Sequence, residues 1–350
     1  METNGRALIA MSGGVDSSVA VLRMQEKGYD CVGATMRLFS ESAAVGEAAA
    51  VAAALGIPHH LFDFRNEFVE KVMDPFVEAY LAGTTPNPCI RCNRWLKFDR
   101  LLAKADELGC EKIATGHYAR VTQNEETGRL ELRRGKDSKK DQSYVLYILT
   151  QAQLSRVEFP LGELTKEQVR EIARARGFSN AEKGESQDIC FIPDGKYEDF
   201  VRARAHAADR GMCPGNIVDE EGAVLGTHRG YIGYTIGQRK GLGLPSTEPW
   251  YVTAIRPETN EVVVGRRESA CGRELLATDF NWLSIEAPTA PLRAQAKTRY
   301  RAAAADCVVT PLSGGDVRVV FDEPQWAITR GQAVVVYDGD VVLGGGTICR

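Results

Sequence analysis

The segment that decides the fold is Met11-Ser12-Gly13-Gly14-Val15-Asp16-Ser17-Ser18, which follows a short apolar run from Ala7 to Ala10. Helical periodicity begins at Ser17, so the segment lies between a strand and a helix. The first N–H groups of a helix have no intrahelical partner, and they attract anions. The two glycines let the backbone approach a phosphate, and Ser12 and Ser17 add hydroxyl donors. The segment therefore predicts a phosphate site.

Asp16 would repel a phosphate unless a cation lay between them, which indicates Mg²⁺. The loop is not of the Walker A type, because no Gly-Lys-Ser/Thr follows at the required spacing. A glycine turn with a Ser or Asp helix cap would explain three of these residues, but not all six in order. The order Ser-Gly-Gly-x-Asp-Ser is similar to the PP-loop of ATP pyrophosphatases, which adenylate a carbonyl oxygen and release pyrophosphate. We expect ATP to contact Ala10, Met11, Ser12, Gly13, Gly14, Val15, Asp16 and Ser17.

Strands and helices alternate over the first half of the chain, which is typical of a parallel α/β sheet. The expected strands are 7–10, 29–38, 59–63 and 112–115, and the expected helices are 17–27, 47–55, 67–80 and 97–108. After residue 200, glycines become frequent and short β-rich runs appear at 217–218, 251–255 and 261–264. Longer strands are expected at 294–300, 306–309, 317–321, 332–337 and 341–344. The predicted fold class is α/β: a Rossmann-like PP-loop domain (1–204), a small β-rich central domain (205–270) and a C-terminal β-barrel (271–350).

The composition is that of an ordinary globular protein, with 350 residues, 44% hydrophobic and 26% charged. This excludes a disordered chain, a collagen-like chain and a disulfide-stapled miniprotein. The net charge of −4 argues against a protein that coats nucleic acid over its whole surface. No window reaches the roughly 18 apolar residues of a membrane span, and the N-terminus has no signal-peptide pattern. We therefore expect a cytoplasmic protein with no membrane contact and with reduced cysteines.

Three of the nine cysteines stand in distinctive surroundings. Cys89 and Cys92 form a Cys-x-x-Cys pair in a Pro-rich loop, and Cys190 lies in Asp188-Ile189-Cys190-Phe191. Arg91 and Arg94 flank Cys92, and neighbouring cations lower the pKa of a thiol, so Cys92 is a candidate nucleophile or sulfur carrier. Zinc is less well supported, because no second pair completes four ligands. The three cysteines are also candidate ligands of an iron–sulfur cluster with one open iron.

With these loops in view, the chain resembles the bacterial tRNA 2-thiouridylases, the MnmA/TrmU family, from Ala7 nearly to its end. The matching motifs are long and specific. They are 10–17, Thr85-Pro86-Asn87-Pro88, Cys92-Asn93, Ala114-Thr115-Gly116-His117-Tyr118, Asp141-Gln142-Ser143-Tyr144, 188–192, 237–243, Pro249-Trp250-Tyr251-Val252, Lys297-Thr298-Arg299-Tyr300 and Phe321-Asp322-Glu323-Pro324.

The resemblance implies ATP-dependent replacement of O2 by sulfur on the wobble uridine of the tRNAs for Lys, Glu and Gln. Adenylation makes the oxygen a good leaving group, Cys190 carries a persulfide, and Cys92 is the nucleophile. A cysteine desulfurase or sulfur-relay protein would supply the sulfur, and the expected state is a monomer. The resemblance places Met36 and Gly116 at the adenosine, and Asn87, Pro88 and Cys89 at the target base. It places at the tRNA His117, Lys140, Asp141, Gln142, Arg299, Tyr300 and Gln332.

One departure from the family concerns Cys89. Many members have an aspartate there, which is proposed to act in acid–base chemistry, and a thiol supplies no carboxylate. Either water or another group moves the proton, or Cys89, Cys92 and Cys190 bind a [4Fe–4S] cluster. We favour the persulfide route.

Basic clusters offer an acidic chain the means to hold tRNA. Residues 89–140 carry an excess of Lys and Arg over Asp and Glu. The clusters are Arg133, Arg134, Lys136, Lys139 and Lys140; Arg239 and Lys240; and Lys297, Arg299 and Arg301. A PP-loop amidotransferase acting on a small molecule would need neither these clusters nor the cysteines. A non-catalytic tRNA-binding or sulfur-carrier protein would not need the phosphate loop.

Overall fold

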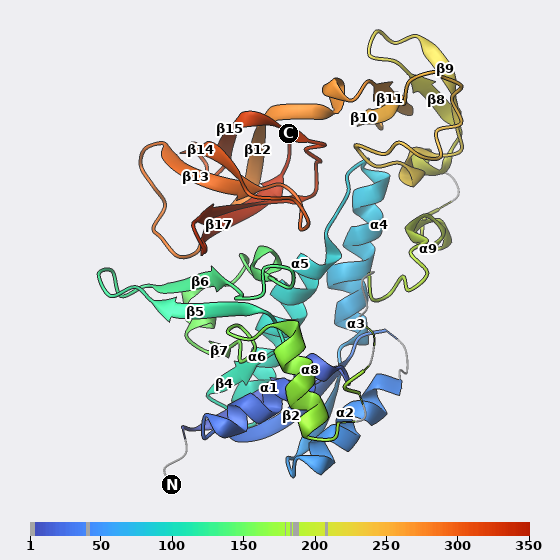
Figure 1. The fold of residues 1–350 in the computed structure, drawn as a ribbon. Coiled ribbons are helices and arrows are strands. Elements are labelled where there is room, and N and C mark those ends of the chain that lie inside the picture. Colours follow the sequence, from blue (N-terminus) through green and yellow to red (C-terminus); the bar gives the residue numbers. More distant parts are fainter. Residues whose placement is uncertain (1–3, 40–42, 179, 183, 185–188, 207–208) are drawn as a thin grey trace.

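The computed structural model describes residues 4–39, 43–178, 180–182, 184, 189–206 and 209–350. It consists of an N-terminal parallel-sheet domain, a smaller β-rich part and a C-terminal antiparallel β-barrel (Figure 1). The predicted fold class is therefore confirmed. Within the described residues, no helix is long and apolar enough to cross a membrane.

Five parallel strands form the N-terminal sheet, in the order β3-β2-β1-β4-β7. They are β1 (Arg6–Ala10), β2 (Asp30–Arg37), β3 (His59–Asp63), β4 (Lys112–Ala114) and β7 (Val157–Glu158). Alternate residues of β1 enter different cores: Ala7 and Ile9 pack with α1 and α2, whereas Leu8 packs with Phe98 on the opposite face. Burial on both faces explains why the β1 sequence is a continuous apolar run.

Helices and wide turns connect these strands. They are α1 (Val15–Glu26), α2 (Ala43–Ala54), α3 (Arg65–Phe68), η1 (Val69–Met73), α4 (Asp74–Leu81), α5 (Pro88–Cys92), η2 (Asn93–Arg100), α6 (Leu101–Glu107), η3 (Ser143–Val145), α7 (Gln151–Leu154) and α8 (Lys166–Ala175). The turns η1 and η2 are π-helical, and each joins two α-helical pieces. α8 begins with a capping box, in which Thr165 and Gln168 each bond the other's backbone N–H.

The central part is a four-stranded sheet in the order β10-β11-β8-β9. Its elements are α9 (Tyr197–Arg204), η4 (Arg210–Met212), β8 (Gly215–Val218), β9 (Val224–His228), η5 (Tyr231–Gly233), β10 (Tyr251–Arg256), β11 (Glu261–Gly265) and η6 (Glu268–Ala270). Val252 and Val262 share a core with Phe76 of α4. The Tyr231 hydroxyl donates to the Leu81 carbonyl oxygen over 2.6 Å. The central part is thus anchored on α4, the helix that precedes the cysteine loop.

Six antiparallel strands form the C-terminal barrel, which closes through pairing of β12 with β17. The strands are β12 (Cys271–Trp282), β13 (Leu292–Lys297), β14 (Ala305–Pro311), β15 (Val317–Trp326), β16 (Ala333–Asp338) and β17 (Val341–Ile348). Val334 and Val336 belong to the barrel core, while Val335 and Tyr337, which alternate with them along the strand, belong to the core of the N-terminal domain. Both faces of β16 are therefore buried.

A hairpin of the N-terminal domain extends the barrel sheet, and the sequence analysis did not predict it. It consists of β5 (Ala119–Gln123) and β6 (Leu130–Arg134). Arg133 of β6 pairs with Val341 of β17, and Figure 1 shows the hairpin running beside the barrel. The predicted domain boundaries at 204/205 and 270/271 stay predictions. The barrel has a core of its own, but some of its residues also belong to the core of the N-terminal domain.

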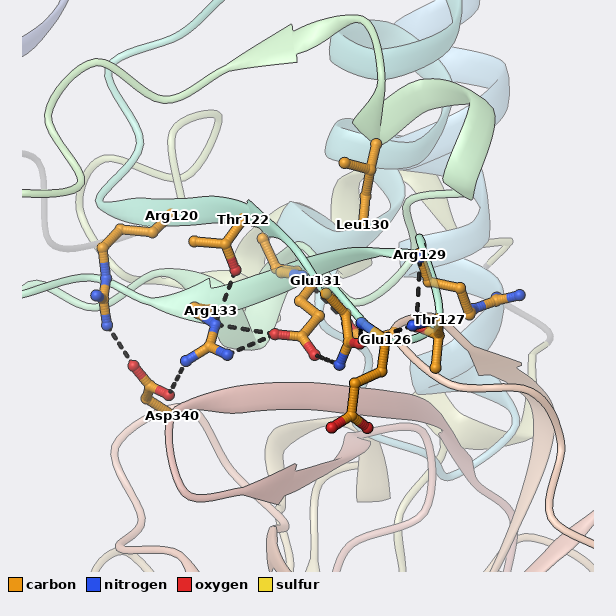
Figure 2. A network of polar contacts seen from close by, with 12 residues as sticks. Arg120, Thr122, Glu126, Thr127, Arg129, Leu130, Glu131, Arg133 and Asp340 are labelled. Atoms are coloured by element: carbon orange, nitrogen blue, oxygen red, sulfur yellow. Dashed lines mark hydrogen bonds and ion pairs between the residues drawn. The ribbon is translucent and has the colours of Figure 1, made fainter.

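A polar network joins the hairpin to the turn between β16 and β17 (Figure 2). The Asp340 carboxylate accepts from the guanidinium groups of Arg120 and Arg133, the latter over 2.9 Å. Arg133 also donates to Glu131, whose other oxygen accepts from Asn124 over 2.8 Å. The Arg134 N–H donates to the Asp340 carbonyl oxygen. One carboxylate thus holds two arginines from both strands of the hairpin.

Replacing Asp340 with alanine should loosen the hairpin from the barrel. Two partly exposed ion pairs together contribute about 1 kcal/mol, so hydrogen exchange at the β5 and β6 amides should rise about fivefold. Asp322→Ala is the control, because Asp322 pairs with Arg293 within the barrel. Equal exchange of the hairpin amides in the two variants would contradict this role of Asp340.

Candidate functional site

The predicted phosphate loop lies at the carboxyl end of β1 and opens α1. Gly13 has φ +73°, a conformation that favours glycine. The Ser17 hydroxyl accepts from the Ser12 N–H over 3.2 Å and donates to the Gly14 carbonyl oxygen over 2.9 Å. The loop is therefore held in shape by its own side chains, while the first turn of α1 presents backbone N–H groups to an anion.

Asp16 is neutralised by a lysine that the sequence analysis missed. The Lys166 ammonium donates to both Asp16 carboxylate oxygens, over 2.7 and 2.8 Å, and the Tyr118 hydroxyl donates to one of them over 2.7 Å. Lys166 is the first residue of α8 and is buried. The prediction that Asp16 binds Mg²⁺ stays a prediction, because the carboxylate is paired with Lys166 in this structure.

Asn180 is a second residue that the sequence analysis missed. Its amide nitrogen donates to the Gly13 carbonyl oxygen and to the Ser18 hydroxyl, both over 3.0 Å, and the side chain is buried. Its sequence context gives no signal, because Asn180 is far along the chain from the loop. The contact fixes the outer side of the phosphate loop.

The loop from Thr115 to Tyr118 follows β4 and contacts both the phosphate loop and the helical segment η2. A Cβ at Gly116 would lie 3.1 Å from the Asp16 Cβ and 3.1 Å from the Ser17 nitrogen, so a larger residue would push into the phosphate loop. His117 is buried against the Phe98 and Phe159 rings, and it shares a 2.7 Å hydrogen bond with the Thr115 hydroxyl. Burial and then the nearby Lys97 charge hold the pKa of His117 well below 6.5, so its ring is neutral at pH 7.

The Cys-x-x-Cys pair lies on the short helix α5. The Asn87 side chain caps this helix by accepting from the Cys89 N–H over 3.2 Å, and Pro88 is its first residue. Cys89 is exposed and Cys92 is buried. Asn93, next to Cys92, donates to the Val145 carbonyl oxygen over 3.0 Å and ties η2 to the barrel-facing core.

Cys190 is exposed, and its neighbour Phe191 anchors it. The Phe191 ring packs edge-on against Phe68 and Phe76, each with 5.5 Å between ring centroids. Residues 185–188, including Asp188 of the predicted motif, lie outside the described part of the chain. Partial desolvation, and then the neighbouring Cys92 and Cys89, raise the pKa of the Cys190 thiol to about 12. The three cysteines of interest are therefore neighbours.

The prediction that arginines lower the pKa of Cys92 is wrong. Burial raises that pKa, and the cation that opposes the effect is Lys97. Arg91 turns away and donates to the Lys71 carbonyl oxygen over 2.7 Å. Lys97 is also the cation that acts on Cys89, Cys190 and His117. This lysine, which the sequence analysis did not single out, is the shared positive charge of the cysteine site.

The cysteines as placed do not form a metal-binding group. Among the residues that the structure describes, no three His, Cys, Asp or Glu side chains converge on a common point that could hold a metal ion. Cys92 is buried while Cys89 and Cys190 are exposed, so their sulfurs face different surroundings. The iron–sulfur alternative therefore gains no support from this arrangement and stays a prediction.

Two of the residues predicted to contact tRNA form hydrogen bonds to the protein's own backbone. Gln332 donates to the carbonyl oxygens of Thr85 and Pro86, over 2.9 and 3.3 Å, and so holds the loop that leads to Cys89. Arg299 donates to the carbonyl oxygens of Ala327 and Ile236. Both side chains are already engaged inside the protein.

The other predicted tRNA residues divide between structural and surface positions. Asp141 accepts from the Gly135 and Ser143 N–H groups, and Gln142 accepts from the Tyr118 N–H over 3.0 Å. Tyr300 is exposed, and Lys140 is half-exposed. Met36 packs between the two cores that flank the site, and Ala10 lies at the end of β1.

Lys166→Met should weaken ATP binding, because it leaves the Asp16 charge beside the phosphate loop without its cation. We expect the Kd for ATP to rise about tenfold, since an uncompensated, partly buried charge costs at least about 1.4 kcal/mol. The double variant Asp16→Asn/Lys166→Met should recover most of that loss. Calorimetric titration measures both, with Lys27→Met as the control, because Lys27 pairs with Glu158 at an exposed site. An unchanged Kd for ATP in Lys166→Met would contradict this role of Lys166.

Lys97→Met should make Cys92 less reactive at a given pH, because it removes the charge that favours the thiolate. The pH profile of Cys92 alkylation should move to higher pH, and Lys97→Arg should keep it near the wild-type profile. Peptide mass spectrometry after timed iodoacetamide treatment reports each cysteine separately. The control is Lys104→Met, which removes an exposed lysine paired with Glu107. The same profile in Lys97→Met and Lys104→Met would contradict the assignment.

Family models cover nearly the whole chain. The tRNA methyl transferase HUP domain matches residues 5–194, the tRNA methyl transferase PRC-barrel domain matches 199–266, and the aminomethyltransferase beta-barrel domain matches 272–348. A crystal structure of a 4-thiouridine synthetase–RNA complex with bound ATP is similar at 19% identity, with a TM-score of 0.38. It covers 55% of this chain and 46% of that chain, and a likeness at this level carries no argument about activity.

Curated relatives match over their full length. The tRNA-specific 2-thiouridylase MnmA of Carboxydothermus hydrogenoformans is 50% identical, with 99% of each chain covered. That of Heliobacterium modesticaldum is 50% identical over 98% of this chain and 92% of its own, and that of Clostridium perfringens is 46% identical over 99% of both. By these matches, the chain belongs to the MnmA family of tRNA-specific 2-thiouridylases.

Proposed function

We propose that this protein is an ATP-dependent tRNA uridine 2-sulfurtransferase that acts on the wobble uridine. The observation that carries the proposal is one loop that serves two sites. Gly116 and Tyr118 contact Asp16 of the phosphate loop. His117, which lies between them, packs against Phe98 of η2, and the charge of Lys97 lowers its pKa. A nucleotide site and a thiol site are therefore built on the same four residues.

The first step is adenylation of the uracil O2. The phosphate loop holds the ATP phosphates, and the O2 attacks the α-phosphorus, which forms an O–P bond and releases pyrophosphate. The C2 oxygen then leaves as part of AMP, a far better leaving group than an oxide or hydroxide. Lys166 keeps Asp16 neutralised while the phosphates are bound.

The second step transfers sulfur. A persulfide on Cys190 attacks C2, and the C2–O bond breaks with release of AMP. Cys92 then attacks the Cys190 sulfur, which forms a Cys92–Cys190 disulfide and releases the sulfur on C2 as 2-thiouridine. An external thiol reductant returns the disulfide to two thiols. The persulfide terminal sulfur is more acidic than a thiol, so the high pKa of the resting Cys190 thiol does not block the step.

The proton chemistry differs from that of relatives with an aspartate at this position. Cys89 has no carboxylate, and its N–H is bound to Asn87. His117 is neutral but buried, with one ring nitrogen bonded to Thr115. We propose that Lys97 stabilises the thiolates and that water takes the proton, since Lys97 is the cation common to the three cysteines.

The finer assignments follow from family membership. The expected substrates are the tRNAs for Lys, Glu and Gln, the expected sulfur donor is a cysteine desulfurase or a relay protein, and the expected state is a cytoplasmic monomer. Mg²⁺ would arrive bound to ATP. The relatives carry thiouridylase names, and the HUP family carries a methyl transferase name. A phosphate loop beside reactive thiols fits sulfur transfer, because methyl transfer needs neither.

The test is mass spectrometry of nucleosides from unmodified tRNA after treatment with iron-free enzyme, Mg-ATP and a persulfide donor. We expect 2-thiouridine at the wobble position. Cys92→Ser and Cys190→Ser should each lower its yield below about one-hundredth, because each removes a sulfur that changes bonding partners. Cys271→Ser, at the start of barrel strand β12 and far along the chain from the three cysteines of interest, is the control.

Two outcomes would overturn parts of the proposal. Recovery of activity only after anaerobic cluster reconstitution would make Cys89, Cys92 and Cys190 iron ligands, in spite of their placement. Absence of product under both conditions, together with pyrophosphate release that depends on a small molecule instead of tRNA, would assign the protein to the amidotransferases.

A further inference from the structure

Arg134, at the end of β6, carries a guanidinium group with buried nitrogen atoms. Its central carbon lies over the Tyr337 ring, 4.0 Å from the ring centroid. Its Nε and Nη2 atoms are buried, and neither has a hydrogen-bond partner among the described residues. Buried donors cost free energy unless they are satisfied, so two of them on one charged group point to a missing acceptor.

Lys297, at the end of β13, brings a second cation to the same place. Its ammonium lies over the Tyr144 and Tyr300 rings, 5.8 and 5.9 Å from their centroids. Burial lowers the pKa of Lys297, and the charge of Arg134 lowers it further, so the two cations are close enough to repel each other. They come from different domains, because β6 belongs to the N-terminal domain and β13 to the barrel.

The described residues around Arg134 and Lys297 supply too little negative charge to balance these two cations. Asp141 is the acid that acts on Lys297, and its oxygens already accept from Gly135 and Ser143. Arg299 nearby donates only to neutral oxygens. Within the described part of the chain, none of Arg134, Lys297 and Arg299 forms a salt bridge. Lys297 and Arg134 therefore have one nearby carboxylate, Asp141, and its oxygens are already hydrogen-bonded.

We propose that Arg134 and Lys297 together bind one backbone phosphate of the tRNA, next to the nucleotide that reacts. This inference rests on the proposed function and names a contact within it. The guanidinium fork would supply the hydrogen bonds and Lys297 a point charge. The exposed Tyr300 ring beside them offers a surface on which a base can stack.

The position relative to the cysteines supports RNA over a free nucleotide. The Tyr144 hydroxyl donates to the Ala333 carbonyl oxygen over 2.7 Å. The preceding residue, Gln332, holds Thr85 and Pro86 of the loop that leads to Cys89. The phosphate site is thus connected through two hydrogen-bonded links to the target-base loop. The ATP phosphates have their own loop at Ser12 to Ser17.

The experiment measures the Kd of unmodified tRNA as a function of salt for Arg134→Gln, Lys297→Gln and the wild type. One lost phosphate contact should reduce the slope of log Kd against log salt by about 0.7 to 0.9. We expect roughly tenfold weaker binding in 0.1 M salt, and Arg134→Lys should keep most of the slope. The Kd for ATP, measured on the same samples, should stay at the wild-type value.

Arg318→Gln is the matched control, because it removes an exposed barrel arginine that is paired with Glu274. A variant that fails to fold would lose ATP binding as well, and in that case the remaining single variant decides. If both variants still bind tRNA with the wild-type slope of log Kd against log salt, the proposed phosphate site is wrong, and the proposed function is unaffected. A wild-type protein that does not bind tRNA would instead overturn the proposed function. A changed Kd for ATP with an unchanged tRNA slope would assign these cations to the nucleotide.

Discussion

The parallel pairing of β1 with β2 and β4 is the constraint on which the site depends, because it brings the carboxyl ends of three strands to one edge. The phosphate loop follows β1, Met36 lies near the end of β2, and the Thr115 to Tyr118 loop follows β4. The partly buried ion pair between Lys166 and Asp16 then fixes the charge of that edge. The residues of the phosphate loop are preorganised, so little ordering remains to be done when the nucleotide binds.

The barrel is part of this arrangement and not a separate attachment. Its strand β16 is buried on both sides, and Gln332 just before it holds the loop that leads to Cys89. Arg299 connects barrel residues to Ile236 of the central part. A tRNA that pressed on the barrel would therefore act on the cysteine loop through direct hydrogen bonds.

Local patterns made much of the fold predictable. The continuous apolar run of β1 and the glycine loop after it predicted the phosphate site, and the succession of strands after residue 271 predicted the barrel. The β5–β6 hairpin was missed because its charged residues, such as Arg133 and Glu131, are satisfied only by Asp340, far along the chain. Lys166, Asn180 and Lys97 were missed for the same reason: their partners are distant in sequence, and no motif marks them. The prediction that the arginines beside Cys92 lower its pKa was wrong because adjacency in sequence does not fix where a side chain points. Arg91, for example, donates to the Lys71 carbonyl oxygen.

The most direct test of the central claim follows the oxygen that sulfur replaces. Unmodified tRNA carrying ¹⁸O at the uracil O2 would be treated with enzyme, ATP and a persulfide donor in ordinary water. If O2 is adenylated before sulfur attacks, the AMP released must carry one ¹⁸O for each 2-thiouridine formed. Formation of 2-thiouridine with unlabelled AMP would contradict the account, because the oxygen would then have left by another route.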